Sequence, residues 1–190
     1  MADLTTQAKC KRALGIPSAL TMHDDYLDTL IEVADAQVVG YCGVAGFTSS
    51  TVTAEAYDIE MTSQSEVVLR NFPVSAVSAV VSAGTTLNEN AWYFDSNTGT
   101  IRLVSLGGFF PQGNQTVKVS YTYGFSTIPS DLSHAATIVV CGLFNRTRHA
   151  GLATEAAAGY RYRVEDQGIP RAAEAILSRY RRLIPRGSQP

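Results

Sequence analysis

A helical repeat of apolar residues marks the first part of the chain. Apolar side chains recur at three- and four-residue steps between Leu27 and Tyr41, which is the spacing of one face of an α-helix. Thr21 and Asp24 have the spacing of a capping box before this face, and Gly43 follows it as a terminator. The pattern therefore predicts a helix that begins near Asp24 and ends near Gly43. A shorter helix is predicted upstream, capped by Thr5 or Thr6 and ended at Leu14-Gly15.

The most apolar helix is predicted after Pro129, where Ser130 and Asp131 are good helix-start residues. A helix that is apolar on nearly every side is buried from several directions. The apolar residues of this helix are Leu132, Ala135, Ala136, Ile138, Val139, Val140, Leu143 and Phe144. In a domain this small, we expect a neighbouring subunit to supply one of the covering walls. The residues expected at that inter-subunit contact are Ile138, Val140, Leu143 and Phe144.

Residues 47–125 follow a different pattern, rich in Val, Thr, Ser, Tyr and Gly and with short alternating runs. Turn residues separate the runs, with Gly84 in one turn and Asn97-Thr98-Gly99 in another. Short strands at this spacing predict a small antiparallel sheet or sandwich. The candidate strands are Glu55–Glu60, Glu66–Arg70, Ala76–Ser82, Ala91–Asp95, Thr100–Val104 and Thr116–Tyr123.

The C-terminal segment combines a start rich in Gly, Ala and Thr, which indicates flexibility, with a strand-like alternation at Tyr160–Val164. Pro170 suits the first turn of a last helix, whose apolar face extends to Ile184. Three arginines are expected in its final turn, where cations are favoured. A helix of about 15 residues is only marginally stable alone in water. We therefore expect it to dock on its own body or on another chain.

Together these patterns predict an α+β protein. A small α-helical bundle, formed by residues 1–46 and 126–149, is expected to carry an antiparallel β-sheet or sandwich insertion between its second and third helices. The insertion spans residues 47–125. Residues 150–190 are expected to form an extended C-terminal arm with a terminal helix.

Charge is unevenly distributed along this chain. The formal net charge is −2, but residues 1–145 carry 6 Lys and Arg against 13 Asp and Glu, whereas residues 146–190 carry 9 Arg against 4 acidic residues. The two parts therefore have net charges of −7 and +5. An acidic body with a basic tail indicates two surfaces with different partners.

The sequence contains no constellation of residues that predicts an enzyme. It has no P-loop, no G-x-G-x-x-G and no G-x-S-x-G motif. His23, His134 and His149 show no metal-ligand spacing with cysteines or acidic residues. Acidic residues near Asp24 lie where a helix dipole favours a carboxylate, which is their simplest explanation. We expect no catalytic residues, no cofactor and no bound metal.

Cysteine usage and hydropathy bear on the compartment. Cys10, Cys42 and Cys141 are far apart and odd in number, so we expect small buried thiols rather than a disulfide framework. No apolar run approaches the roughly 20 residues that a membrane-spanning helix needs. The N-terminus lacks the apolar core of a signal peptide. These features predict a soluble protein, made in a cytoplasm and without a membrane partner.

The tyrosines and arginines of the arm allow three interpretations. Both residue types are those that protein–protein hot spots prefer. The positive charge of the arginines also favours phosphate, although the arm contains no lysine and Glu165-Asp166 follows the basic run. The remaining interpretation is a solvated helix face. We favour docking of a protein partner.

Five short motifs occur in an order that is found in a known family. Each is common alone, but their order and spacing are more specific. Over residues 4–184, the chain resembles the head–tail connector proteins of tailed bacteriophages, which are the adaptor or head-completion subunits. The motifs are Tyr41-Cys42-Gly43, Phe72-Pro73-Val74-Ser75-Ala76-Val77, Tyr121-Thr122-Tyr123-Gly124-Phe125, Ile128-Pro129-Ser130-Asp131-Leu132 and Tyr180-Arg181-Arg182-Leu183.

The resemblance implies a structural virion protein. Such subunits form a ring, usually a dodecamer, that stacks beneath the portal protein at the capsid vertex, in the neck of the virion. Stopper or tail-completion proteins attach below the ring. Double-stranded DNA passes through the lumen during packaging and ejection without sequence-specific binding, and an acidic body would repel its phosphates. Assembly is expected in the host cytoplasm. The residues expected to contact the portal are Tyr160, Tyr162, Arg163, Tyr180, Arg181 and Arg182.

Other functions stay open on the sequence alone. A nucleic-acid-binding module that uses the basic arm predicts DNA affinity that falls steeply with salt. Another neck or tail-completion component of the same particle would share most of the motifs. An enzyme whose site is spread over loops would leave no linear motif, because function depends on a site and not on a fold.

Overall fold

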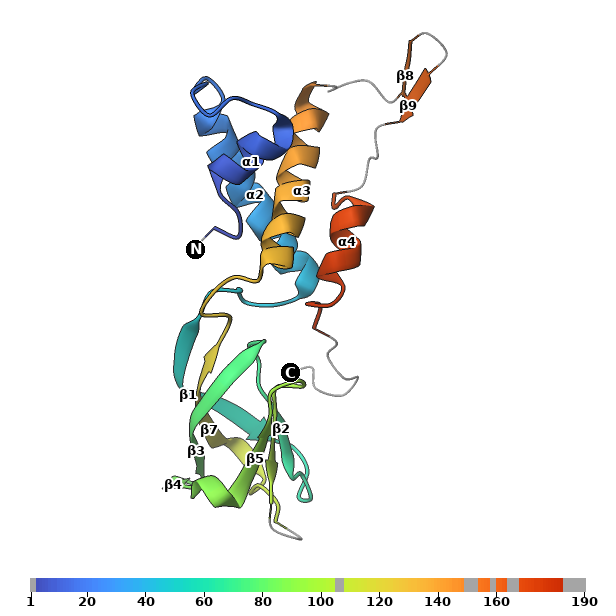
Figure 1. Cartoon of the computed structure of the whole chain (residues 1–190). Coiled ribbons are helices and arrows are strands. Elements are labelled where there is room, and N and C mark those ends of the chain that lie inside the picture. Colours follow the sequence, from blue (N-terminus) through green and yellow to red (C-terminus); the bar gives the residue numbers. More distant parts are fainter. Residues whose placement is uncertain (1–2, 105–107, 149–153, 158–159, 164–167, 183–190) are drawn as a thin grey trace. The chain divides into compact units, whose positions relative to one another are not determined.

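The computed structural model describes residues 3–104, 108–148, 154–157, 160–163 and 168–182, with the backbone alone at 147–148, 154–157 and 160–163. The chain forms two compact units, which we refer to as the helical unit and the β unit (Figure 1). The helical unit takes in residues 1–43 and 128–182, and the β unit is built around residues 44–127.

The described residues of the helical unit form four helices, with α3 packed against each of the other three. Leu132, Ala135 and Val139 of α3 are fully buried, so the near-complete apolar surface of this helix is explained by the helices that cover it. The helices are α1 (Gln7–Leu14), α2 (Asp24–Cys42), α3 (Ser130–Arg148) and α4 (Arg171–Leu177).

The connection between α1 and α2 is held by a buried lysine. Lys11 is 5% exposed, its Nζ donates to the Leu20 carbonyl oxygen at 2.9 Å, and it forms an ion pair with Asp24. The predicted capping box of Thr21 and Asp24 is wrong. Because α2 begins at Asp24 itself, His23 is the N-cap residue, and Thr21 lies outside the helix. The alternative cap of α1 is settled in favour of Thr6, whose side chain accepts from the Lys9 backbone N–H.

In the part of the β unit that the structure describes, the strands form two antiparallel sheets, with strand orders β1-β7-β3-β4 and β2-β6-β5. The strands are β1 (Ser50–Ile59), β2 (Glu66–Val68), β3 (Val74–Ser82), β4 (Thr85–Thr86), β5 (Trp92–Asp95), β6 (Thr100–Leu103) and β7 (Gly113–Tyr123). The first strand begins five positions before the predicted Glu55. Its start escaped prediction because the pairing of β1 with β7 is irregular between Val52 and Glu55, where Ala54 has a φ of 53°.

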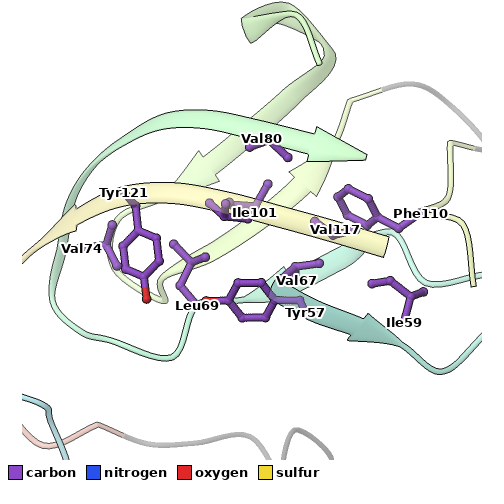
Figure 2. Packing of buried hydrophobic residues seen from close by; sticks show 11 residues of the cluster. Tyr57, Ile59, Val67, Leu69, Val74, Val80, Ile101, Phe110, Val117 and Tyr121 are labelled. Atoms are coloured by element: carbon purple, nitrogen blue, oxygen red, sulfur yellow. The ribbon is translucent and has the colours of Figure 1, made fainter. Parts of the chain in front are cut away.

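A continuous apolar core lies between strands of both sheets (Figure 2). The strand β7 contributes Val117, Val119 and Tyr121, all fully buried, while β2 and β6 contribute Val67 and Ile101. Fully burying a side chain of this size stabilises a fold by roughly 1.5–3 kcal/mol. The predicted α+β class, with the sheets inserted between α2 and α3, is confirmed.

The chain enters and leaves the β unit through two neighbouring segments. Phe125 N–H donates to the Phe47 carbonyl oxygen at 2.7 Å, and Ser49 N–H donates to the Phe125 carbonyl oxygen at 3.0 Å. Gly124 lies at this crossing with a φ of +85°. A Cβ atom at Gly124 would lie 2.3 Å from the Thr48 carbonyl oxygen, so the approach of the two backbones requires glycine.

The C-terminal segment differs from the predicted arm. A hairpin of β8 (Thr154–Ala157) and β9 (Tyr160–Arg163) confirms the predicted strand, except for Val164, which lies outside the described residues. The last helix is 7 residues long, so the prediction of about 15 residues is wrong. Arg179, Arg181 and Arg182 therefore lie beyond the end of α4 and not in its last turn. Contacts of this stretch with α2 and α3, described below, draw the chain away from the helical path.

Candidate docking site at the C-terminal segment

The apolar face of α4 is buried in the helical unit. Ala173 and Leu177 are fully buried where α4 packs on α2 and α3. At the start of α4, a Cβ on Gly142 of α3 would lie 3.1 Å from Cγ of Pro170, so the missing side chain allows close packing. A helix this short is not stable alone in water. Docking on its own body, one of the two expected outcomes, is therefore what keeps α4 folded.

The end of α2 is capped by the turn that follows α4. The Arg182 backbone N–H donates to the Cys42 carbonyl oxygen at 2.9 Å, which satisfies a carbonyl that has no partner within its own helix. The Cys42 thiol lies 3.7 Å from the Leu177 carbonyl oxygen. Burial raises the pKa of Cys42 to about 11, so this thiol is unreactive at neutral pH. Cys10 is also buried as expected, whereas Cys141 is only half-buried.

A hydrogen bond between a phenol and a carboxylate joins the same turn to the start of α3. The Tyr180 hydroxyl donates to Oδ1 of Asp131 at 2.6 Å. Burial and this bond raise the pKa of Tyr180 to about 12, while accepting the bond lowers the pKa of Asp131. Hydrogen bonds to an ionised group are roughly twice as strong as neutral ones. This contact therefore fixes the position of Tyr180.

Two weaker contacts complete the site on its exposed side. The Tyr41 hydroxyl donates to Oε1 of Glu174 at 3.2 Å. The Arg181 guanidinium carbon lies 5.7 Å from the centroid of the Tyr41 ring, within the range of a cation–π interaction. The Arg181 side chain thus covers the Tyr41 ring near the C-terminal end of α2.

The structure brings together only part of the predicted portal-contact set. Tyr180, Arg181 and Arg182 lie at the turn after α4, where they contact their own helical unit. Tyr160, Tyr162 and Arg163 belong to β9, and their side chains lie outside the described residues. Contact of these six residues with a portal protein stays a prediction.

The residues predicted at the inter-subunit contact divide into two kinds. Val140 is fully buried, and Phe144 is 5% exposed, with its ring centroid 5.6 Å from that of His23. Ile138 and Leu143 are half-buried. Val140 and Phe144 therefore serve the chain's own core, and the half-buried pair has the surface that a neighbouring subunit could contact.

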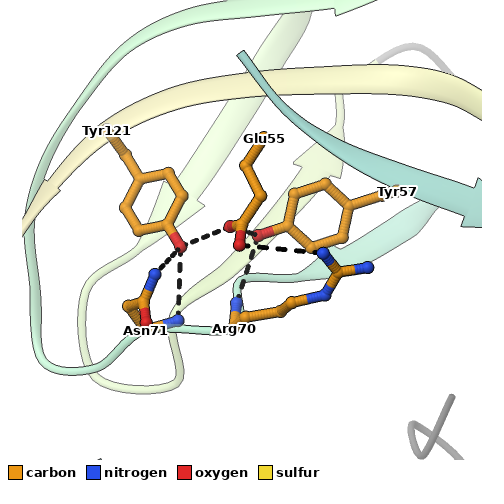
Figure 3. Close-up of polar contacts among 5 residues, drawn as sticks. All are labelled: Glu55, Tyr57, Arg70, Asn71 and Tyr121. Carbon is orange, nitrogen blue, oxygen red and sulfur yellow. Dashed lines mark hydrogen bonds and ion pairs between the residues drawn. The ribbon is translucent and has the colours of Figure 1, made fainter. Parts of the chain in front are cut away.

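A polar network closes one side of the β unit (Figure 3). Oε2 of Glu55 accepts hydrogen bonds from the hydroxyls of Tyr57 at 2.5 Å and of Tyr121 at 2.6 Å. Asn71 Nδ2 donates to the Tyr121 hydroxyl at 2.8 Å, and the Arg70 guanidinium carbon lies 5.0 Å from the centroid of the Tyr57 ring. The network fixes the segment after β2 against β1 and β7.

Sequence reasoning missed the residues that build these two sites. The sequence predicts Asp131 as a helix-start residue and Tyr41 as part of an apolar face, each also within a family motif, and it predicts no role for Glu174. An acid and a tyrosine that are 49 positions apart leave no local pattern. For Glu55 a signal existed, because a strand with an inward acid two positions from an inward tyrosine requires a partner for the carboxylate.

A buried carboxyl group lies beneath the N-terminal segment of the helical unit. Asp35 of α2 is 6% exposed, and its Oδ2 accepts a hydrogen bond from the Leu4 backbone N–H at 3.0 Å. Its Oδ1 is buried without a hydrogen-bond partner. Burial, only partly opposed by the Leu4 bond, raises the pKa of Asp35 to about 6. Compared with the unfolded chain, the folded protein therefore favours the neutral form of this carboxyl group.

The substitution Asp35→Asn is expected to reduce the pH dependence of stability. In the unfolded chain an aspartate has a pKa of about 3.9, so the folded state holds more protons between about pH 4 and pH 6 and stability falls as pH rises through this window. The amide keeps an acceptor for Leu4 and does not ionise. We expect the loss of unfolding free energy between pH 4.5 and 7.5 to shrink by about 1–3 kcal/mol, measured by urea unfolding. Asp25→Asn, at an exposed position, is the control. An unaltered pH profile in Asp35→Asn would contradict the assignment.

Among the described residues, no group of three or more His, Cys, Asp and Glu side chains is arranged to hold a metal ion. None of the described helices is both long and apolar enough to cross a membrane.

The fold and the docked C-terminal segment define an α+β protein whose four-helix unit carries an inserted two-sheet β unit. The family model of the head completion protein matches residues 3–183. The chain therefore belongs to the head completion protein family, which confirms the resemblance seen in the sequence motifs.

Solved structures of gene transfer agent particles contain chains with the same fold. A chain from the neck of an empty gene transfer agent (GTA) particle, computed with C6 symmetry, is 21% identical, with a TM-score of 0.52 over 96% of this chain and 92% of that one. A chain from the virion of a native GTA particle is 23% identical, with a TM-score of 0.53 over 96% and 91% of the two chains. A comparison with curated proteins gives no match.

Proposed function

We propose that this chain is the adaptor subunit of a head–tail connector. In this role it forms a ring, with twelve copies as the family resemblance suggests, beneath the portal protein in the neck of the virion. The ring links the portal to a stopper or tail-completion protein, and double-stranded DNA passes through its lumen. The observation that carries the proposal is the match to the head completion family over residues 3–183.

The solved structures support a place in the neck. Chains of the same fold occur in the neck of a GTA particle and in the GTA virion. Their coverage of more than nine-tenths of both chains means that the helical unit and the β unit each have a counterpart there. A structural role in the particle neck therefore fits both units of the chain.

The charge of the body supports passage of DNA. Residues 1–145 carry a net charge of −7. Negative charge repels phosphate, so a lumen with this charge would let DNA slide without binding. Assembly of the ring is proposed to take place in the host cytoplasm.

The hairpin between α3 and α4 is the proposed portal contact. Its strands pair with each other over Thr154–Ala157 and Tyr160–Arg163. A two-stranded hairpin is only marginally stable alone in water, and its edge can add to the sheet of a partner. Tyr160, Tyr162 and Arg163 supply the residue types that dominate such contacts. The docked helix α4 follows the hairpin in the chain, so it ties the C-terminal side of the hairpin to the helical unit.

The triple substitution Tyr160→Ala, Tyr162→Ala, Arg163→Ala is expected to weaken portal binding. Truncating a single hot-spot residue costs at least about 2 kcal/mol, so a single hot spot among the three is enough to lower affinity at least about 30-fold. Binding is measured by cosedimentation with purified portal rings. Thermal unfolding should not change, because α4 remains docked. A truncation at residue 150 is the poorer test, since it also removes the buried Leu177.

Tyr93→Ala is the matched control, because Tyr93 is an aromatic residue that is 60% exposed on the β unit. Portal affinity equal to the wild type in the triple variant would contradict the hairpin as the contact. A wild-type chain that is present in purified necks but binds no portal rings would indicate another neck component in place of the adaptor.

A further inference from the structure

The outer face of α2 carries apolar residues where a surface helix normally carries polar ones. Tyr26 and Val33 are 37% and 42% exposed, and Ala36 and Gly40 continue the same stripe at three- and four-residue steps. Exposed apolar side chains that form a row mark a contact surface more often than scattered ones do. We refer to these four residues as the α2 stripe.

An acidic row borders the α2 stripe along one side. Asp25, Asp28 and Glu32 are all exposed, and their spacing places them one above another on the helix. Oδ1 of Asp28 accepts a hydrogen bond from Gln7 Nε2 of α1 at 3.1 Å, so α1 lies on the side of the acidic row. An apolar centre with a charged rim is the usual anatomy of a protein interface.

The complementary charge lies on the C-terminal segment of the same unit. Arg171, Arg179 and Arg181 are exposed on α4 and the turn after it. Residues 168–182 include four arginines and a single acidic residue, Glu174. In Figure 1, α4 lies beside α3 on the side away from α1. The basic and acidic surfaces are therefore on different sides of the helical unit.

Arg181 cannot reach the acidic row of its own copy. Arg181 is held against Tyr41, at the C-terminal end of α2. Glu32 and Asp25 lie 9 and 16 positions before Tyr41, which at 1.5 Å per residue is about 14 and about 24 Å along the helix axis. These spans exceed the reach of an arginine side chain whose backbone is fixed at the far end.

We propose that the α2 stripe and its acidic row dock the arginines of the C-terminal segment of a second copy of this chain. The contact joins two different surfaces, so each copy offers one to each neighbour, and repetition around an axis closes a ring. Charge complementarity selects the partner and its orientation, while Tyr26 and Val33 supply the apolar centre. The inference rests on the proposed ring function, which it makes specific.

A charge exchange tests this contact. Glu32→Arg and Arg179→Glu each place like charges at the proposed interface, and each should weaken self-association at least about tenfold at low salt. The two substitutions in one chain restore opposite charges and should recover most of the wild-type association. Self-association is followed by sedimentation velocity of the full chain, alone and on portal rings, with circular dichroism to verify folding. Glu89→Arg, an exposed acid of the β unit, is the control for added positive charge.

Each outcome bears on a different statement. Loss in both single variants with recovery in the double variant supports the interface. Rings that form equally well in all variants overturn this interface and leave the ring itself standing. A wild-type chain that stays monomeric both alone and on portal rings overturns the proposed adaptor function.

Discussion

Gly124→Ala is expected to destabilise the β unit by about 3 kcal/mol or more, since it combines a left-handed backbone with a steric collision. The φ of Gly124 is +85°, where an alanine is strained. The added Cβ would lie 2.3 Å from a backbone oxygen of Thr48. That oxygen belongs to a segment paired with Phe125, so it cannot move without breaking the crossing at which the β unit begins and ends.

Thermal unfolding monitored by circular dichroism gives the measurement for this substitution. Gly46→Ala is the matched control, because a Cβ at Gly46 meets nothing within 4 Å and its φ lies outside the left-handed range. The control should alter stability by less than about 0.5 kcal/mol. Equal melting temperatures for Gly124→Ala and the wild type would show that the two backbones do not cross this closely.

Leu177→Ala is expected to release the docked C-terminal segment. Leu177 is fully buried, and truncating a buried leucine costs 2–5 kcal/mol, or about 3 kcal/mol on average. Because α4 is too short to persist alone, the Tyr180–Asp131 bond and the cap on Cys42 should be lost with it. The free energy of unfolding is measured with urea. The reactivity of the buried Cys42 thiol toward a disulfide reagent reports release of the segment directly.

The thiol readout separates release of α4 from general destabilisation. Cys10 is also fully buried but lies in α1, so its labelling should stay slow while that of Cys42 rises. Ile176→Ala, at a half-buried position on the same helix, is the matched variant and should leave Cys42 protected. If Cys42 stays unreactive in Leu177→Ala, the segment is held by its polar contacts and not by Leu177.

Much of the fold can be predicted from the local pattern of apolar and polar residues. The three- and four-residue steps from Leu27 to Tyr41 correspond to the buried face of α2, and alternation in residues 116–123 corresponds to the buried residues of β7. Patterns of this kind report which side of an element is covered. They do not report what covers that side, so the proposed partner follows from the family resemblance and not from the pattern.

The failures of prediction have physical causes of a different kind. The last helix stops early because Tyr180 and Arg182 are drawn to Asp131 and to Cys42, residues far away in the sequence. The start of β1 escaped prediction because the irregular pairing at Ala54 interrupts alternation. Tyr180 and Arg181 are predicted to contact the portal. The sequence could not show that they have partners within their own chain, since those partners come from α2 and α3.

The paired entry and exit of the β unit have a consequence for folding order. The helices α2 and α3 pack on each other although residues 43–129 separate them in the sequence. Once the strands next to Phe47 and Phe125 have paired, only short stretches on either side of that pair remain free. Shortening a loop from nearly ninety residues to about ten is roughly three halvings, which lowers the entropic cost of closure by about 2 kcal/mol. A β unit that folds first would thus hold the ends of α2 and α3 close together. A substitution that disrupts the pairing next to Phe47 and Phe125 would then slow formation of the helical unit, although it changes no residue of a helix.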